Sequence, residues 1–228
     1  MKKRIVIIVT IVSMLFPLCG YAQRRTEQNV AVGVKGGMTM SRVNFAPSIQ
    51  QGMLKGLALG VSARYIEEAH FGLIGEFFIE QRGWQESFED LPFQYSRKFT
   101  YLQIPILTHI FFGSDKARFF INLGPEFSFM IGESVSSNFD VTNTASIADF
   151  PANRHTQQYL LDVNSKFDYG IAAGMGVEVN VNQRNSILLE GRFYYGLGNV
   201  FSSHKSDYFS ASPGMSIMVT LGYMFRLK

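Results

Sequence analysis

Cysteine is nearly absent from this chain of 228 residues, which contains one cysteine and one tryptophan. The cysteine, Cys19, lies in an N-terminal segment that we expect to be removed. The remaining chain would have no thiol, so neither a disulfide nor a cysteine-ligated metal site could form in it. No cluster of other residues has metal-ligand spacing either. An exported domain of this kind has to be held together by its main-chain hydrogen bonds and its surroundings.

A basic and then apolar segment begins the chain. Three basic residues at positions 2–4 precede an apolar run over residues 5–18, which is too short to span a bilayer as a helix. Gly20 and Ala22 are small residues at positions −3 and −1 of a cut before Gln23. This pattern predicts a secretory signal peptide that is cleaved after residue 22.

An excess of charge of one sign is also absent after this cleavage. Residues 1–22 carry three basic and no acidic side chains, so the 21 Lys and Arg of the full chain become 18, against 18 Asp and Glu. The net charge of residues 23–228 is therefore zero, and we expect no nucleic-acid partner.

Apolar and polar residues alternate in eight segments of the remaining chain, most clearly over residues 99–112. There, Leu102 and Ile104 share one parity and Gln103 the other. A period of two predicts β-strands, because successive side chains of a strand point to opposite faces. Pro105 cannot donate a ladder hydrogen bond, so a local irregularity is expected there. The predicted strands cover about residues 30–41, 55–65, 71–84, 99–112, 118–131, 167–180, 186–197 and 214–225.

The connections between these segments alternate in length. Those after the second, fourth and sixth segments are short, the others are long, and the longest covers about residues 132–166. An even number of strands with short turns at one end and long loops at the other is typical of an outer-membrane barrel. We predict an all-β fold over residues 23–228, an eight-stranded antiparallel up-and-down transmembrane β-barrel without a second domain.

Alternation alone leaves open which face points inward. A soluble lipocalin-like barrel would enclose the apolar face, and a membrane barrel would expose it to lipid. Glycines recur on the polar face, where they would weaken a solvated strand but would fit the narrow lumen of an eight-stranded barrel. We therefore expect the polar face inside, with an ion-pair network of five acidic and four basic residues. The glycines are Gly56, Gly60, Gly72, Gly124, Gly170, Gly174, Gly176 and Gly222, and the charged residues are Glu76, Glu80, Glu126, Glu178, Glu190, Lys35, Arg64, Arg82 and Arg192.

Two other kinds of side chain have expected structural roles. His109 shares the inward parity, and we expect a hydrogen-bonded histidine in the lumen rather than a metal ligand. Aromatic residues near the strand ends are expected to anchor the barrel at the membrane interfaces. These residues are Trp84, Tyr101, Tyr195, Tyr223 and Phe225.

Seven segments carry a more specific pattern: GVKGGMTMS, EFFIEQRGW, YLQIPIL, LGPEFSF, FDYGIAAGMGVE, EGRFYYGLGN and VTLGYMF. Together they resemble the PorT-like outer-membrane β-barrel family of Bacteroidetes, and Tyr-Leu-x-Ile-Pro is their most specific part. The resemblance covers essentially the whole chain after the expected signal. It implies eight strands and insertion in the outer membrane. It also implies a link to protein secretion, since the founding member of the family is needed for type IX secretion, but it carries over no catalytic motif.

Three functions stay open for such a barrel. The first is a non-enzymatic role, either structural, in surface interaction, or as an accessory of secretion or envelope assembly. The second is a lipid-A-modifying barrel enzyme, which would need a nucleophile, a base and an acid close together. The third is ligand binding by a soluble lipocalin-like barrel. Loop residues of the types that the enzyme would need are Asp149, His155, Ser203, His204, Ser206 and Asp207.

We favour the non-enzymatic role, because polar loops contain such residues by chance. On this interpretation the chain has no catalytic, cofactor-binding or metal-binding residues and needs no cofactor. Its expected partners are outer-membrane lipid and lipopolysaccharide, together with envelope or secretion proteins.

The expected cleavage can be tested directly. N-terminal sequencing of the protein from the membrane fraction should give a mature chain that begins at Gln23. A chain that begins at Met1, or one with a lipidated Cys19, would contradict the predicted signal peptide.

Overall fold

The computed structural model describes residues 29–89, 91–151, 154–163, 165–205 and 207–227. The expected signal peptide lies outside these residues. No helix in the described ranges is long and apolar enough to cross a membrane.

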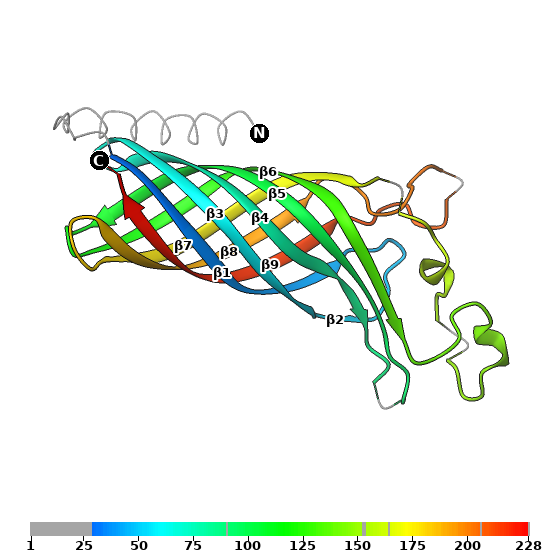
Figure 1. The fold of residues 1–228 in the computed structure, drawn as a ribbon. Helices are drawn as coiled ribbons and strands as arrows, with labels where there is room; N and C mark the ends of the chain where they lie inside the picture. Colours follow the sequence, from blue (N-terminus) through cyan, green and yellow to red (C-terminus); the bar gives the residue numbers. More distant parts are fainter. Residues whose placement is uncertain (1–28, 90, 152–153, 164, 206, 228) are drawn as a thin grey trace, which may run out of the picture.

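One antiparallel sheet forms a closed barrel (Figure 1). The first long strand, β1, pairs with β3 on one side and with β9 on the other, and each remaining long strand pairs with the next along the chain. Eight long strands therefore close the barrel in the described part of the chain, and the two-residue β2 pairs with β4 beside it. The strands are β1 (Asn29–Val43), β2 (Gln51–Gly52), β3 (Leu54–Glu68), β4 (Phe71–Glu86), β5 (Tyr95–Gly113), β6 (Ala117–Ser137), β7 (Phe167–Asn180), β8 (Asn185–Gly196) and β9 (Gly214–Arg226).

All eight predicted strands are confirmed, and β5 and β6 exceed their predicted lengths the most. β5 has 19 residues and β6 has 21, whereas a strand needs only about 9–11 residues to cross a bilayer. The irregularity at Pro105 is also confirmed. The pairing of β4 with β5 lapses there, between Gly75 opposite Ile106 and Phe78 opposite Gln103.

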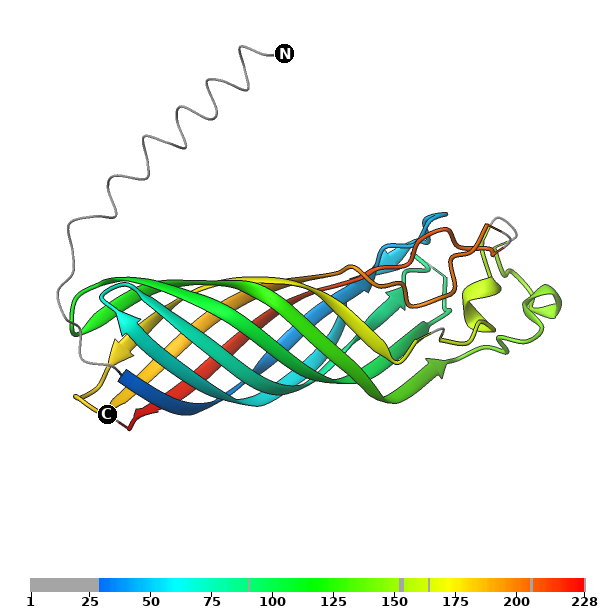
Figure 2. The same cartoon turned by 90° about the horizontal axis from the view of Figure 1, so that it is seen from above.

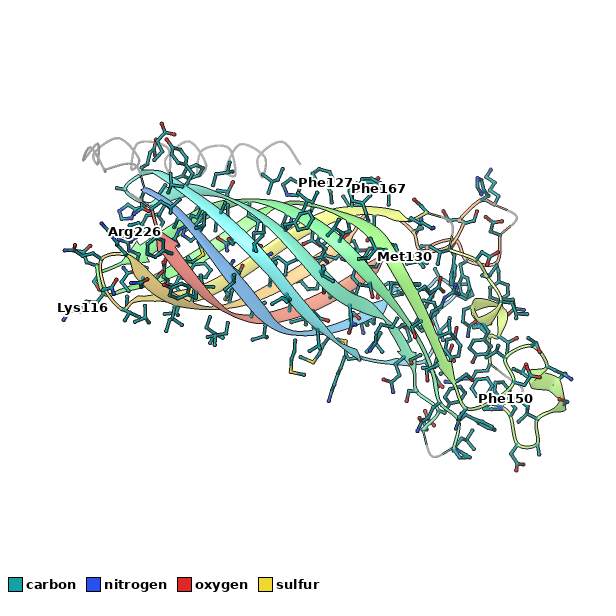
Figure 3. The ribbon with its side chains drawn as sticks, viewed as in Figure 1. Lys116, Phe127, Met130, Phe150, Phe167 and Arg226 are labelled. Carbon is teal, nitrogen blue, oxygen red and sulfur yellow. The ribbon has the colours of Figure 1, made fainter. Side chains whose placement is uncertain are left out.

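The polar face points into the barrel and the apolar face points out. Leu57 and Leu221 are 62% and 61% exposed, whereas Lys35 and Glu190 are 2% and 1% exposed. The outward side chains form an apolar belt around the wall, in which Phe127 is seen in Figure 3. The expected orientation of the two faces is therefore confirmed.

Inward glycines leave room for the larger side chains of the lumen. A Cβ atom on Gly60 would lie 2.5 Å from the carbonyl oxygen of Phe77 and 2.6 Å from the ring of Phe78. A Cβ atom on the outward Gly75 would meet nothing within 4 Å. The narrow lumen thus explains why glycine recurs on the polar parity.

The expected aromatic anchors separate into two groups. Tyr195, Tyr223 and Phe225 point outward near strand ends. Trp84 and Tyr101 are buried inside the barrel, so the expectation that they anchor the wall is wrong. Both residues have the inward parity of their strands. Parity, and not nearness to a strand end, determines which way their side chains point.

The two ends of the barrel differ. At one end, which we call the turn end, β1 begins, β9 ends and short turns join the other strands (Figures 1 and 2). Lys116 and Arg226 lie there, and Phe150 lies in the long loops at the opposite, loop end (Figure 3). These loops contain two 3-10 helices, η2 (Thr144–Ser146) and η3 (Gln157–Tyr159).

Labels attached to single introduced cysteines test which face meets lipid. Labels at the outward Leu57, Ile171 and Leu221 should be quenched by lipid-borne quenchers, because these side chains would lie in hydrocarbon.

Labels at the inward Ser62, Ser128 and Thr220 serve as the matched control and should not be quenched. Equal quenching of the two sets, or a reversed pattern, would contradict a membrane-embedded wall.

Candidate functional site

The middle of the lumen is filled by a ring of four charged side chains. Lys35 contacts Glu76 and lies 2.8 Å from Glu190, as measured between Nζ and Oε2. Arg192 lies 2.5 Å from Glu76 and 2.9 Å from Glu190. Each cation therefore meets both carboxylates, and charges alternate around the ring. All four side chains are at most 2% exposed, so the ring pairs charges that burial would otherwise destabilise.

A second ion pair lies nearer the turn end. Arg64 donates two hydrogen bonds to Glu178, of 2.7 and 2.9 Å. The hydroxyl of Ser186 donates a third, of 2.5 Å, to the same carboxylate. These contacts cross-link β3, β7 and β8 through the lumen.

A third cluster lies nearer the loop end and centres on Arg82. Its guanidinium lies 2.9 Å from Asp168 and 3.5 Å from Glu126. The centres of the Tyr101 and Tyr194 rings lie 4.1 and 4.3 Å from the guanidinium carbon. Such stacking stabilises a buried cation.

The predicted network is confirmed, but its membership was incomplete. Asp168 is a sixth acidic residue and was missed, although it shares the parity of Gly170 in β7. The stacking of Tyr101 on Arg82 was also missed, because Tyr101 was assigned to the wall.

His109 forms the expected hydrogen bond inside the lumen. Its Nδ1 lies 2.7 Å from the side-chain oxygen of Asn122, and the side-chain N–H of Asn122 donates to Glu190 at 2.9 Å. His109 therefore extends the ion-pair ring.

Little free space remains in the lumen. Two cavities beside the network have volumes of about 10 Å³ each, about the space that one water molecule requires. Nearer the turn end, a layer of apolar side chains closes the passage: Ala31, Ile66, Phe111, Phe120, Leu188 and Met224. The barrel is thus plugged by its own side chains.

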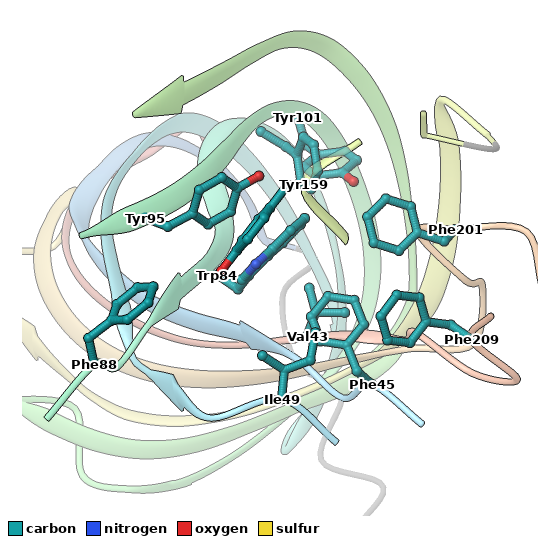
Figure 4. Packing of buried hydrophobic residues seen from close by; sticks show 11 residues of the cluster. Val43, Phe45, Ile49, Trp84, Phe88, Tyr95, Tyr101, Tyr159, Phe201 and Phe209 are labelled. Atoms are coloured by element: carbon teal, nitrogen blue, oxygen red, sulfur yellow. The ribbon is translucent and has the colours of Figure 1, made fainter. Parts of the chain in front are cut away.

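The long loops fold over the loop end as a cap around an aromatic cluster (Figure 4). Trp84 is fully buried there, with its ring 5.2 Å from that of Phe45 and 5.8 Å from that of Phe201. The cap joins residues from the ends of the strands to residues from loops far apart in the sequence. The cluster consists of Val43, Phe45, Ile49, Trp84, Phe88, Tyr95, Phe99, Tyr101, Tyr159, Phe201 and Phe209.

Polar contacts attach the longest loop to the strand ends. The hydroxyl of Tyr159 donates to Glu86 at 2.8 Å, and the side chain of Gln158 donates to the same carboxylate at 2.7 Å. Burial raises the pKa of Tyr159 above that of an ordinary phenol. Arg97 donates to the carbonyl oxygen of Leu161 at 2.7 Å. The loop is therefore held to the barrel by several side chains.

The candidate catalytic residues that the structure describes do not form a relay. Nδ1 of His204 lies 2.7 Å from the hydroxyl of Ser202 and 3.1 Å from the carboxylate of Asp207. In a hydrolytic triad the acid and the nucleophile contact different ring nitrogens, so that the histidine can carry a proton between them. Here both contact the same nitrogen. Hydrogen bonds from the Ser202 hydroxyl and the His204 main-chain N–H lower the pKa of Asp207. The Asp207 carboxylate therefore acts as a hydrogen-bond acceptor that stabilises the loop.

The other candidates are dispersed. Ser203 accepts a hydrogen bond from Asn199, and His155 contacts the hydroxyl of Tyr208. Asp149 is exposed, and Ser206 lies outside the described residues. Within the described ranges, no group of three or more His, Cys, Asp or Glu side chains could hold a metal ion.

Comparison with protein families decides the class of this barrel. Residues 21–202 match the model of the outer membrane protein beta-barrel domain. The chain belongs to this family. It is a small outer-membrane β-barrel protein, so lipid surrounds its apolar wall, and its long loops face the exterior of the cell.

Several solved structures are similar to this outer-membrane barrel. OprG of Pseudomonas aeruginosa has 11% sequence identity and a TM-score of 0.47, with 89% of this chain and 98% of that chain covered. Neisserial surface protein A has 12% identity and a TM-score of 0.44, with 85% and 95% covered. Ail of Yersinia pestis has 14% identity and a TM-score of 0.41, with 86% and 98% covered. No curated protein matches the sequence.

Removal of one partner from a lumen pair should destabilise this barrel strongly. Arg64→Met would leave the Glu178 carboxylate buried without its cation, at a cost of about 3–5 kcal/mol. The double variant with Glu178→Leu should recover most of this loss, as measured by urea unfolding in lipid vesicles.

Arg42→Ala, on an exposed side chain, is the control and should change stability by less than about 0.5 kcal/mol. A double variant no more stable than Arg64→Met alone would show that the charges do not depend on each other.

The plugged lumen predicts the absence of a pore. The purified protein should show no steady porin-like conductance in planar bilayers, because side chains fill an eight-stranded lumen. Large, uniform single-channel steps would contradict the packing of the lumen.

Proposed function

We propose that this protein is a non-enzymatic outer-membrane barrel whose cap binds other macromolecules at the cell surface. The folded cap carries the proposal. Strands β5 and β6 continue well beyond the length that a membrane crossing needs, and the loops pack on them around a buried aromatic cluster. Ordering these loops costs conformational entropy, and a rigid exterior surface is what binding without a large ordering cost requires.

Two observations favour binding over catalysis or transport. Ser202 and Asp207 both contact the same ring nitrogen of His204. This arrangement can stabilise a turn but cannot pass a proton from the serine through the histidine to the aspartate. The lumen holds ion pairs and two cavities of about one water molecule each.

The resemblance to the PorT-like family supports an accessory role in secretion or envelope assembly. In that role the cap would contact envelope or secretion proteins, and the wall would contact outer-membrane lipid and lipopolysaccharide. A stand-alone surface-binding barrel is the second candidate, and the same cap supports it. In both cases, residues 1–22 would direct export and residues 23–228 would form the mature barrel domain.

Chemical cross-linking on intact cells, followed by purification in mild detergent, tests this function. A variant in which a short Gly-Ser linker replaces residues 132–166 should insert normally but lose the cross-linked partners of the intact protein. A stable stoichiometric partner would support the accessory role, and surface partners without such a complex would support the stand-alone barrel.

The matched control carries the same linker in the turn at residues 181–184 and should keep all partners. Partners that survive removal of the loop would place binding on the barrel wall. A lipid-A mass profile that changes on gene deletion, and that wild-type protein but not His204→Ala restores, would contradict the non-enzymatic role.

A further inference from the structure

The extension of β5 and β6 beyond the barrel has one unpaired edge. The pairing of β6 with β7 ends at Phe129 opposite Phe167, whereas the pairing of β6 with β5 continues to Ser137 opposite Tyr95. On the other side of this extension, β2 covers the edge of β4. Within the described ranges, residues 132–137 of β6 therefore have a β-strand partner on one side only, where β6 runs past the barrel (Figure 1).

The register shows which main-chain groups point to this edge. Asn138 donates its N–H to the carbonyl oxygen of Gln94, across the β5 side. Main-chain groups alternate in direction along a strand, so those of Glu133, Val135 and Ser137 point away from β5. Among the described residues, no main-chain group bonds to them on that side, and all three residues are exposed.

The chemistry of the edge suits an uncharged extended segment. The carboxylate of Glu133 contacts Arg97, so no unpaired charge faces a partner. Val135 is 49% exposed, and serine occupies positions 134, 136 and 137. Proteins usually block a free edge with lysine or proline, and residues 132–137 contain neither.

A second copy in the same membrane does not fit this edge. Copies inserted in the same direction are related by an axis along the membrane normal. Because strands of such barrels tilt by about 35–45°, two β6 edges would cross at about 70–90° and could not pair as antiparallel neighbours. The partner therefore has to be a segment of another protein.

We propose that the free edge of β6 binds an extended, uncharged peptide segment of another protein as an added β-strand. The main-chain groups of Glu133, Val135 and Ser137 would supply the hydrogen bonds, and Val135 and the serine hydroxyls would select aliphatic and hydroxyl side chains. This inference deepens the proposed function, on which it rests, by naming the surface of the cap and the chemistry of its partner.

Peptide binding in lipid nanodiscs tests the edge. The probe is a fluorescent, acetylated and amidated nonapeptide with the sequence STVTVTVTS, and the measurement is its anisotropy. It should bind the intact protein saturably. Val135→Pro removes a donor and obstructs the approach of a strand, so the dissociation constant should rise at least tenfold.

Val135→Thr is the matched control, because it keeps the N–H and the β-branched shape, and its binding should stay within twofold of the intact protein. Ser137→Pro provides a second edge variant in case Val135→Pro fails to insert. Equal binding by all variants, or no binding of the peptide to the intact protein, would overturn the proposal.

Hydrogen exchange of the wild-type protein gives an independent measurement. Without peptide, the amides of Glu133, Val135 and Ser137 should exchange at least a hundredfold faster than that of Ser134, which faces β5, and peptide should slow them. Slow exchange in the free protein would show that this chain or a second copy already covers the edge. If the peptide fails to bind while loss of residues 132–166 still removes the cross-linked partners, the edge proposal falls and the proposed function stands.

Discussion

Closure of the main-chain hydrogen-bond ladder is the constraint on which the rest of this structure depends. An N–H or C=O group that faces hydrocarbon without a partner costs several kcal/mol, so a sheet can cross a membrane only when it has no edge there. Pairing of β1 with both β3 and β9 meets this requirement. Because the chain outside the expected signal contains no cysteine, the ladder and the contacts across the lumen have to hold the barrel.

Eight strands enclose so little space that closure also determines the lumen. Glycines such as Gly60 place no side chain in the lumen. The volume that they leave is filled by charged side chains that pair with one another. Buried charges such as Glu178 and Arg192 are tolerable because a partner of opposite charge lies within hydrogen-bond distance. The same packing that supports the wall also blocks the passage.

Beyond the membrane, closure is no longer required, and the structure changes accordingly. Strands β4, β5 and β6 continue as an open sheet, the loops gather around Trp84, and one edge of β6 is left unpaired. In water an open edge can form hydrogen bonds with solvent. The exterior part of the chain can therefore combine a rigid aromatic cap with exposed main-chain groups, a combination that the bilayer would not allow.

The sequence by itself determined the strands, the face that meets lipid and most of the lumen residues, because a period of two assigns each residue to a face without knowledge of its neighbours. The irregularity at Pro105 followed from the missing N–H in the same way. Only the tertiary structure decided that Trp84 belongs to the cap, that Asp168 pairs with Arg82 and that Ser202, not Ser203, meets His204. These contacts join residues far apart in the chain or depend on the path of a loop, and no local period encodes either.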